Sequence, residues 1–417
     1  MALEPEELRR RQQERAVHRA RRKARKRKMI LYLAAAVVIL LACGFLIIRV
    51  AQQGANRSTE PEETLPSTVI HLAAAGDLNV TDGVVSAGGP DHDYTEAFLD
   101  IAHLLADADL TVLNFEGNLC GAPYGASTGS APQGLVESLR NAGVDMLQLA
   151  NSFSINKGLS GLVETINATR AAGLEPLGVY ENEAAFREGK GYTIREVEGI
   201  KIAFVAFTKG MDGMALPQNS ENCVNVLYTD YESTYQDVDE ERISKVLDAA
   251  ASEKPDLTVA LLHWGSEYND TMSSSQNAIV ELMKAHGVDA IIGTHSHYVQ
   301  QMTLDPENGM FIAYSLGDFF SDAVKSGTEY SVILDLEITK NNETGETKIT
   351  GFSFVPIFTV SDGERLRVVR IAEAMTAYDD DYLGKISENA YQDMIYALDR
   401  ITDRTGVSLE EETQETE

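Results

Sequence analysis

Residues 256–300 read DLTVALLHWGSEYNDTMSSSQNAIVELMKAHGVDAIIGTHSHYVQ and decide the fold class. A mainly apolar run of strand length covers 257–262, and a second apolar run covers 288–292. Between them, residues 277–287 place apolar side chains three and four positions apart, which is typical of an amphipathic helix. The order of strand, helix and strand is the repeating unit of α/β domains.

The same alternation continues on both sides of that unit. Further strands are predicted at 69–75, 110–116, 145–150, 174–180 and 310–318, and further helices at 95–108, 134–143, 161–173 and 239–253. Residues 191–208 predict a hairpin that turns at Glu198-Gly199, and residues 330–358 predict a second antiparallel pair. We therefore expect an α/β domain with mixed sheets over 68–360, a helical segment over 361–404 and an acidic tail over 405–417.

Unusual polar residues stand where six of the predicted strands end. In α/β folds, ligands bind beyond the carboxyl ends of the strands, so we expect these residues to meet at one rim. Imidazole and carboxylate are ligands of Zn, Mn and Fe, and two such ions can hold a reacting phosphorus between them. The residues at these ends are Asp77, Asn114, Glu116, Asn151, Ser152, His263, Glu267, His295, His297 and Asp318.

Two readings of these strand ends remain open. Asp and Asn favour helix N-caps for backbone reasons, so Asp77 and Asn151 fit a purely structural role as well. The three histidines fit that alternative less well. The other histidines in the external part, His71, His92, His103 and His286, are interpreted as structural.

Charge is divided very unevenly along the chain. The formal net charge is −29, but residues 1–28 carry twelve Lys or Arg against four Glu. The rest of the chain has 23 cationic and 60 acidic side chains and a net charge of −37. Such an acidic average repels nucleic acid, which excludes a nucleic-acid-binding protein.

The boundary between the two charge regions predicts a membrane anchor. Residues 29–48 (MILYLAAAVVILLACGFLII) contain no charge and are long enough for a hydrocarbon core of roughly 30 Å. The preceding basic leader, 1–28, places the N-terminus in the cytoplasm and the main domain outside the cell membrane. A cleaved signal peptide and lipidation at Cys43 are the alternatives. Residues 49–67 lack apolar periodicity and are interpreted as a stalk.

Two cysteines, Cys120 and Cys223, lie in the predicted external part. Their spacing is uninformative, so a disulfide between them and two buried thiols are both left open.

Six motifs occur in an order and spacing that is specific to one family. They are AAGDLNVTD, LNFEGNL, LQLANSFSINKG, LLHWGSEY, IIGTHSHYVQ and AYSLGDFF, and they cover roughly residues 68–325. In these motifs the chain resembles the bacterial CapA/PgsA-type poly-γ-glutamate capsule-synthesis proteins of the calcineurin-like metallophosphatase superfamily.

The resemblance implies a metallophosphatase-like β-sandwich flanked by helices, with a divalent metal site of one or two ions (Mn, Zn or Fe) on its rim. The motifs imply that the metal ligands are Asp77, Glu116, His263, His295 and His297. Glu267 and Gln300 are implied to orient those ligands or to face the substrate. Metal-bound water is the implied nucleophile.

The third motif departs from the family pattern Ala-Asn-Asn-His-x-x-Asp-x-Gly. Ser152 stands where a metal-ligating Asn is expected, Phe153 where a His would protonate the leaving group, and Asn156 where an Asp is expected. Asp318 stands where the family has Asn, and it could supply a compensating anionic ligand. The loss of a general acid typically costs about 10²–10⁴-fold in rate, so no catalytic residue beyond the metal-bound water is assigned.

Two functions follow as hypotheses. The first is an anchored extracellular metal-dependent hydrolase that cuts a phosphoester or a γ-glutamyl amide in an anionic envelope polymer or its precursor. The second is a catalytically impaired scaffold or export component of an envelope-polymer assembly. A membrane synthase or export complex is the expected partner. The Phe at position 153 favours the second, and the intact set of Asp, Glu and three His favours the first.

Overall fold

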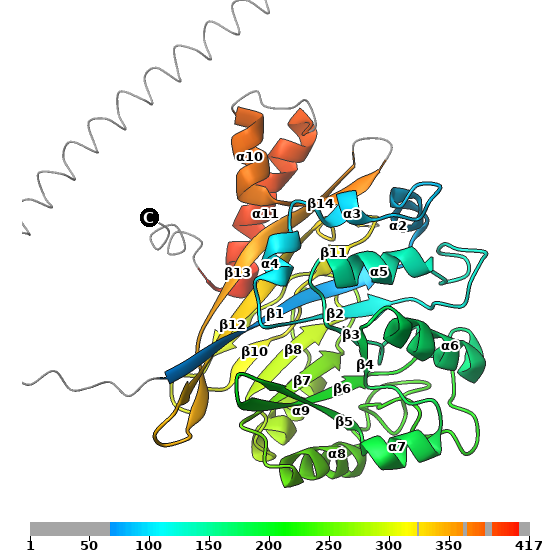
Figure 1. The fold of residues 1–417 in the computed structure, drawn as a ribbon, viewed down its shortest axis with the longest axis vertical. Coiled ribbons are helices and arrows are strands. Elements are labelled where there is room, and N and C mark those ends of the chain that lie inside the picture. The colour runs from blue at the N-terminus through cyan, green and yellow to red at the C-terminus, as the bar shows by residue number, and fades with distance from the viewer. Residues whose placement is uncertain (1–66, 323–324, 362–364, 380–385, 408–417) are drawn as a thin grey trace, which may run out of the picture. The chain divides into compact units, whose positions relative to one another are not determined.

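Two mixed β-sheets form the centre of the computed structural model, which describes residues 67–322, 325–361, 365–379 and 386–407 (Figure 1). The first sheet has the order β14-β13-β12-β1-β2-β3-β4, with β11 also paired to β1, and the second has the order β5-β6-β7-β8-β10-β9. The strands of the first sheet are β1 (Ser67–Asn79), β2 (Leu110–Glu116), β3 (Met146–Gln148), β4 (Glu175–Leu177), β11 (Asp318–Phe320), β12 (Tyr330–Asn341), β13 (Thr347–Ser361) and β14 (Leu366–Arg370). Those of the second sheet are β5 (Tyr192–Val197), β6 (Ile200–Thr208), β7 (Leu257–His263), β8 (Ala290–Thr294), β9 (Met302–Leu304) and β10 (Phe311–Ala313).

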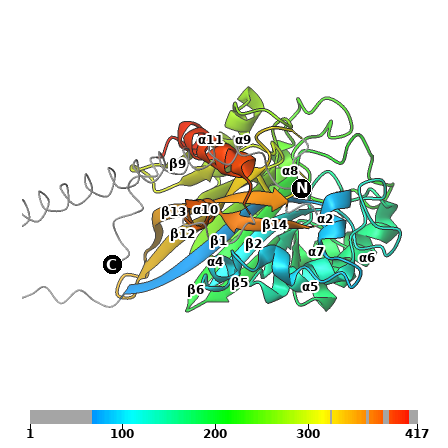
Figure 2. The same cartoon turned by 90° about the horizontal axis from the view of Figure 1, so that it is seen from above.

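Helices cover the outer faces of both sheets, so the layers run helix, sheet, sheet, helix (Figure 1). Figure 2 shows the red helix α11 (Glu388–Thr405) beside the orange strands of the first sheet. The helices beside the first sheet are α2 (Asp82–Ala87), α3 (Thr95–Phe98), α4 (Ala102–Ala106), α5 (Gln133–Asn141) and α6 (Gly158–Ala171). Those on the second sheet are α8 (Glu240–Ser252) and α9 (Ser274–Ala285). The remaining helices are α7 (Glu183–Gly189), α10 (Ile371–Asp379) and α11 (Glu388–Thr405).

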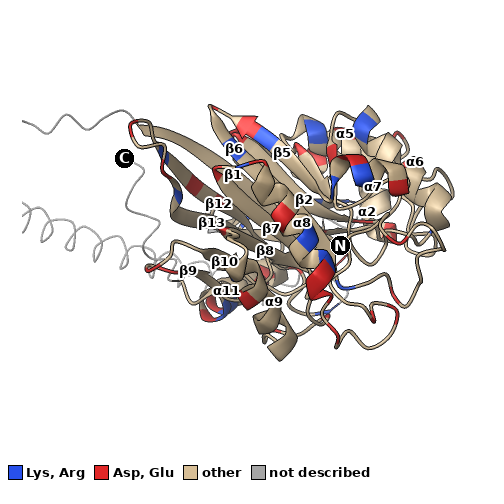
Figure 3. Ribbon diagram, turned by 90° about the horizontal axis from the view of Figure 1, so that it is seen from below, with Lys and Arg blue, Asp and Glu red and all other residues tan. Residues whose placement is uncertain are grey.

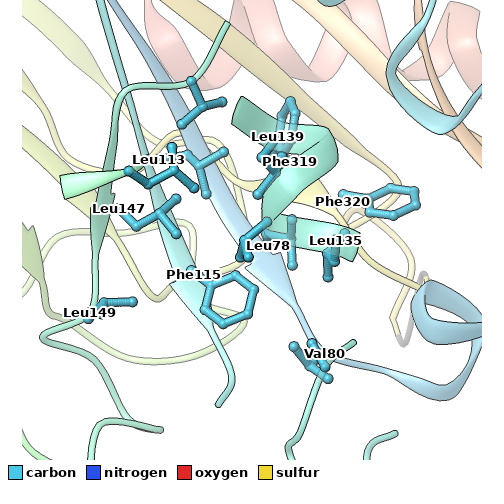
Figure 4. Close-up of a cluster of buried hydrophobic side chains, with 14 of the residues drawn as sticks. Leu78, Val80, Leu113, Phe115, Leu135, Leu139, Leu147, Leu149, Phe319 and Phe320 are labelled. Carbon is cyan, nitrogen blue, oxygen red and sulfur yellow. The ribbon is translucent and has the colours of Figure 1, made fainter. Parts of the chain in front are cut away.

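Three apolar clusters hold the layers together. The central one joins the inner faces of both sheets, for example Leu72 and Val112 with Phe204 and Leu261. A second packs α5 on β2 and β3, where Leu135 lies among the side chains shown in Figure 4. All seven residues of β2 and all seven of β7 are buried, as expected for parallel strands covered on both faces. Figure 3 shows charged residues of both signs on the outer helices, such as α8. The predicted sandwich flanked by helices is confirmed.

The predicted hairpin over 191–208 is also confirmed. Strands β5 and β6 pair antiparallel, and the turn residues Glu198 and Gly199 have φ of 48° and 76°. Those values are typical of the two-residue turns that match strand twist.

The continuous helix predicted over 95–108 is wrong. The structure has two short helices, α3 and α4, and the backbone leaves the helical region at Ile101 (φ −121°, ψ −4°). Between them, Asp100 accepts a hydrogen bond of 2.7 Å from Arg367 of β14. Phe98 packs on two rings of β11, with centroids 5.8 and 5.2 Å away. These contacts to distant elements override the local periodicity.

The single strand predicted over 310–318 is wrong as well. Residues 311–313 form β10 in the second sheet, whereas residues 318–320 form β11 in the first. The chain changes sheet at Gly317, which has φ of 83°. A glycine is favoured there because other residues are strained at positive φ.

Other boundaries differ from the prediction by less. The strands predicted over 145–150 and 174–180 are only three residues long, and residues 366–370 form β14 where a helical pattern was expected. The helices expected further on are present as α10 and α11.

Several predictions concern residues that the structure does not describe. The basic leader, the apolar segment 29–48, the stalk up to residue 66 and the tail from 408 lie outside the described residues. Among the described residues, no helix combines the length and the apolar character needed to cross a membrane. The disulfide left open by the sequence is not formed, because Cys120 and Cys223 are free.

Candidate metal centre

The centre is built where β1 and β11 lie side by side. These strands pair in parallel, and Asp77 is the register partner of Asp318. The backbone N–H of Asp77 donates to the carbonyl oxygen of Gly317 (2.9 Å). A Cβ on Gly76 would lie only 1.9 Å from that same oxygen, so only glycine fits. The register of β1 shifts at this point, and such an irregularity re-aims a side chain.

Asp77, His297 and Asp318 form one group of ligand atoms that lie within 4.8 Å of one another. His297 Nδ1 lies 2.7 Å from Asp318 Oδ1 and 3.8 Å from Asp77 Oδ2. Asp318 Oδ2 also accepts a hydrogen bond from the Ser321 hydroxyl (2.7 Å). All three ligand residues are buried. We call this the aspartate group.

Glu116, His263 and His295 form a second buried group that meets the same distance limit. Glu116 Oε1 lies 3.3 Å from His263 Nδ1, and the rings of His263 and His295 have centroids 4.4 Å apart. The strand ends of β2, β7 and β8 supply these residues. We call this the histidine group.

Asn114 connects the two groups; the sequence places it at a strand end of the expected rim but assigns it no role in the site. Its Nδ2 donates to Asp77 Oδ1 (2.7 Å) and to Glu116 Oε1 (3.0 Å). Its Oδ1 accepts a hydrogen bond from Asn151 Nδ2 (3.0 Å), which also donates to the Phe115 carbonyl (2.7 Å). Asn151 therefore holds the linking amide in place. The signal available in the sequence was the period of two along β2, which puts Asn114 and Glu116 on one face.

Burial and neighbouring charges raise the pKa values of two members of the aspartate group, Asp77 and His297. Burial raises the pKa of Asp77 to about 6, although the positive charge of His297 acts in the opposite direction. Burial alone would lower the pKa of His297, but the hydrogen bond and charge of Asp318 raise it to about 10. A positive charge is therefore already favoured between the two carboxylates.

In the histidine group, the lowered pKa values of His263 and His295 favour neutral imidazole. Burial, helped by the charge of His297, lowers the pKa of His263. Burial also lowers the pKa of His295. Burial and the nearby Asp77 raise the pKa of Glu116 well above its usual range. Metals bind neutral imidazole, so these histidines are in the state that binding requires.

Unpaired buried atoms test whether a cation fits here. Among the described residues, His295 Nδ1 is buried and has no hydrogen-bond partner. His295 and His297 have φ of 90° and 60°, a strained region for residues other than glycine. Buried polar atoms normally have partners, and strained backbone clusters at functional sites. The residues of each group therefore fit a divalent cation, and Asp318 lies in the group with Asp77 and His297.

The residues of the third motif lie beside the histidine group. Ser152 Oγ lies 3.3 Å from His263 Nε2, so the hydroxyl faces the imidazole. Phe153 is half-buried, and its backbone N–H donates to Asn151 Oδ1 (3.0 Å). Its side chain offers no proton.

The remaining predicted residues lie at the margin of the centre. Gln300 is buried and donates to the Asn269 carbonyl (2.7 Å), while its Oε1 has no partner among the described residues. Glu267 is exposed and belongs to neither group. Tyr268, which the prediction missed, stacks on His297 with ring centroids 5.1 Å apart.

Two of the histidines interpreted as structural have ion-pair partners far from the centre. His71 Nδ1 lies 2.8 Å from Asp335, and His286 Nδ1 lies 2.9 Å from Asp248. His92 contacts the Tyr124 ring edge-on, and His103 is exposed on α4. None of these four belongs to the two ligand groups.

Known proteins are similar to this chain over most of the domain. The family model described as "Bacterial capsule synthesis protein PGA_cap" matches residues 71–323. "Capsule biosynthesis protein CapA" of Bacillus anthracis is 30% identical over 51% of this chain and 48% of that protein. "PGA biosynthesis protein CapA" of Bacillus subtilis (strain 168) is 26% identical over 52% of each. The chain thus spans about half the length of the curated relatives it matches.

Solved structures also align with the chain. The calcineurin-like phosphoesterase YfkN from Bacillus subtilis aligns with a TM-score of 0.42 and 16% identity over 81% of this chain and 98% of its own. A phosphatase from Mycoplasma pneumoniae aligns with a TM-score of 0.43 and 14% identity over 70% of this chain and 95% of its own.

Proposed function

Because this chain belongs to the bacterial capsule synthesis protein family PGA_cap, we propose that it is a metal-dependent hydrolase of capsule or other cell-envelope polymer biosynthesis. The observation that carries the proposal is the pair of ligand groups, Glu116–His263–His295 and Asp77–His297–Asp318. A divalent cation bound at such ligands lowers the pKa of water and neutralises charge on an anionic substrate. The substrate bond is a phosphoester or a γ-glutamyl amide.

Three residues of the centre position the proposed metal ligands. Asn114 holds the Asp77 and Glu116 carboxylates at fixed separation, and Asn151 fixes Asn114. Tyr268 holds the ring of His297 by stacking. Because these supports are themselves hydrogen-bonded or packed, the ligands are positioned before any substrate arrives.

The proposal includes a location. Residues 29–48 would anchor the chain in the cell membrane, with the basic leader in the cytoplasm and the described domain outside. An anionic polymer or its precursor would then reach the domain at the cell surface, and a membrane synthase or export complex is the proposed partner. With a net charge of −37 after residue 28, the domain needs bound cations to accept such a substrate.

The test measures metal and turnover on the same preparation. The full-length chain, purified in detergent, should bind one or two Mn²⁺ or Zn²⁺ per chain. It should then hydrolyse either a phosphoester or poly-γ-glutamate, and a chelator should abolish that activity. Less than one metal per chain together with no turnover on either substrate would contradict the proposal.

Phe153 favours a second candidate, a scaffold or export component with the fold but without turnover. The side chain at this position cannot protonate a leaving group. Under this alternative, metal binding would be retained for structure alone, and both substrates would remain intact.

Phe153→His separates the two candidates. Restoring an imidazole next to Ser152 should raise the rate of phosphoester hydrolysis by about 10²-fold or more, because a general acid contributes about that factor. Phe153→Leu serves as the matched control, since it changes the same side chain without adding a proton donor. If the His variant is no faster than the Leu variant while both bind metal, the missing acid does not limit the reaction.

A further inference from the structure

A cavity of ≈ 270 Å³ opens beside the histidine group. His295 and Ser152 line it on the side of the metal centre, and Lys209 and Tyr235 line it elsewhere. His295 is only 4% exposed, and its Nδ1 has no partner among the described residues. The cavity therefore adjoins the candidate metal centre and shares His295 with it.

Lys209 is held in this cavity by contacts from three directions. It directly follows β6, and its backbone N–H donates to the His263 carbonyl (2.8 Å). Its Nζ donates to the Gly265 carbonyl (2.8 Å) and lies 4.4 Å from the centroid of the Tyr235 ring. An ammonium group has three N–H donors, so donors remain after the single carbonyl bond. The side chain is ordered before any ligand binds.

The ammonium group of Lys209 forms no ion pair with a described residue. In the described part of the chain, no carboxylate oxygen lies within the 4.0 Å of Nζ that defines an ion pair. Asp212 and Glu267 line the same cavity, and both residues are exposed to solvent, which weakens their pull on the ammonium group. Burial lowers the pKa of Lys209, whereas these two acids act in the opposite direction.

We propose that Lys209 forms an oxyanion subsite, which holds a carboxylate or phosphate group of the substrate beside the histidine group. The subsite rests on the proposed function, because it gives the same centre a way to orient an anionic substrate. A charge-assisted hydrogen bond from a partly desolvated ammonium group is about twice as strong as a neutral one. Lys209 is a binding and positioning residue here, and it contributes no proton to the reaction.

The test titrates two oxyanions into the full-length chain in detergent, once without metal and once with Mn²⁺. The probes are glutarate and inorganic phosphate, followed by calorimetry. Lys209→Met should weaken binding of at least one probe about tenfold or more, because hydrogen bonds to charged groups contribute on that scale. Lys209→Arg should retain most of the affinity. The probe that depends on Lys209 identifies carboxylate or phosphate as the preferred group.

Lys245→Met is the matched control. Lys245 is exposed on α8, so the variant loses the same charge away from the cavity and should bind both probes like the wild type. The proposal is overturned if wild type binds neither probe, if Lys209→Met binds both unchanged, or if Lys245→Met loses as much. Metal content measured on each variant separates this result from the proposed function. Metal binding can fail while the metal-free titration still depends on Lys209, and the reverse also holds.

Discussion

Asp77→Asn is expected to weaken Mn²⁺ binding about 100-fold or more. Replacing a residue that only supports a metal ligand already lowers metal affinity by about 10–100-fold, and the loss of a ligand should exceed that. The amide keeps the size of the carboxylate but removes the negative charge that faces His297 at 3.8 Å. Hydrolysis should fall with the metal content. Calorimetric titration of Mn²⁺ into the metal-free full-length chain measures the change.

The stability of the metal-free variant distinguishes lost metal binding from misfolding. Burial raises the pKa of Asp77 from 3.8 to about 6, so the ionised carboxylate disfavours the metal-free fold above that pH. The neutral amide removes this cost, but it has only one oxygen for the two N–H donors, Asn114 Nδ2 and the His295 backbone, that the carboxylate accepts from. Metal-free Asp77→Asn should therefore stay folded at pH 8 and lose no more than about 1–3 kcal/mol in the free energy of unfolding, the cost of one buried donor without an acceptor. Asp107→Asn, which makes the same charge change at an exposed position, should bind Mn²⁺ normally. Unchanged affinity in Asp77→Asn would exclude this carboxylate as a ligand.

Gly76→Ala is expected to destabilise the fold by about 3 kcal/mol or more, at the upper end of overpacking effects. The new Cβ would lie 1.9 Å from the carbonyl oxygen and 2.9 Å from the carbonyl carbon of Gly317. Both atoms belong to the backbone, so no side chain can rotate away. β1 and β11 would have to separate, which moves Asp77 away from Asp318. Chemical denaturation measures the stability, and metal titration of the folded fraction measures the site.

Gly351→Ala provides the control for that substitution. Gly351 lies in β13 of the same sheet, and a Cβ there would meet nothing within 4 Å. The change in unfolding free energy should stay within about 0.5 kcal/mol, as for most substitutions away from special features. Equal losses in the two variants would mean that the contact between Gly76 and Gly317 is not what restricts this position.

The predicted elements are correct where neighbouring residues determine the local structure. They are wrong where a contact with a distant part of the chain determines it. The apolar run of β7, the spacing of α9 and the turn at Glu198-Gly199 are each encoded within a few residues, and all three are confirmed. The break between α3 and α4 depends on β11 and β14, which lie more than two hundred positions away in the sequence. Periodicity within a short window carries no information about such partners.

The same distinction between local and distant information applies to the candidate site. The five ligands implied by the motifs all lie in the two buried groups, because each stands at the end of a buried strand. Glu267 is exposed and lines the same cavity as His295, and the Gln300 amide donates to the Asn269 carbonyl. Ligand roles for all of these residues remain predictions until metal is measured.

By itself, the sequence determined the family, the α/β sandwich and the residue types at the strand ends, since these are recorded in short motifs and local periodicity. Only the tertiary structure decided how those residues are shared between an aspartate group and a histidine group. It also decided that Asn114 joins the groups, and that β11 crosses to the first sheet to bring Asp318 beside Asp77. The physical reason is distance along the chain: Asp77 accepts one of its hydrogen bonds from the backbone N–H of His295 across 218 positions, and only the packed sheets bring such residues together.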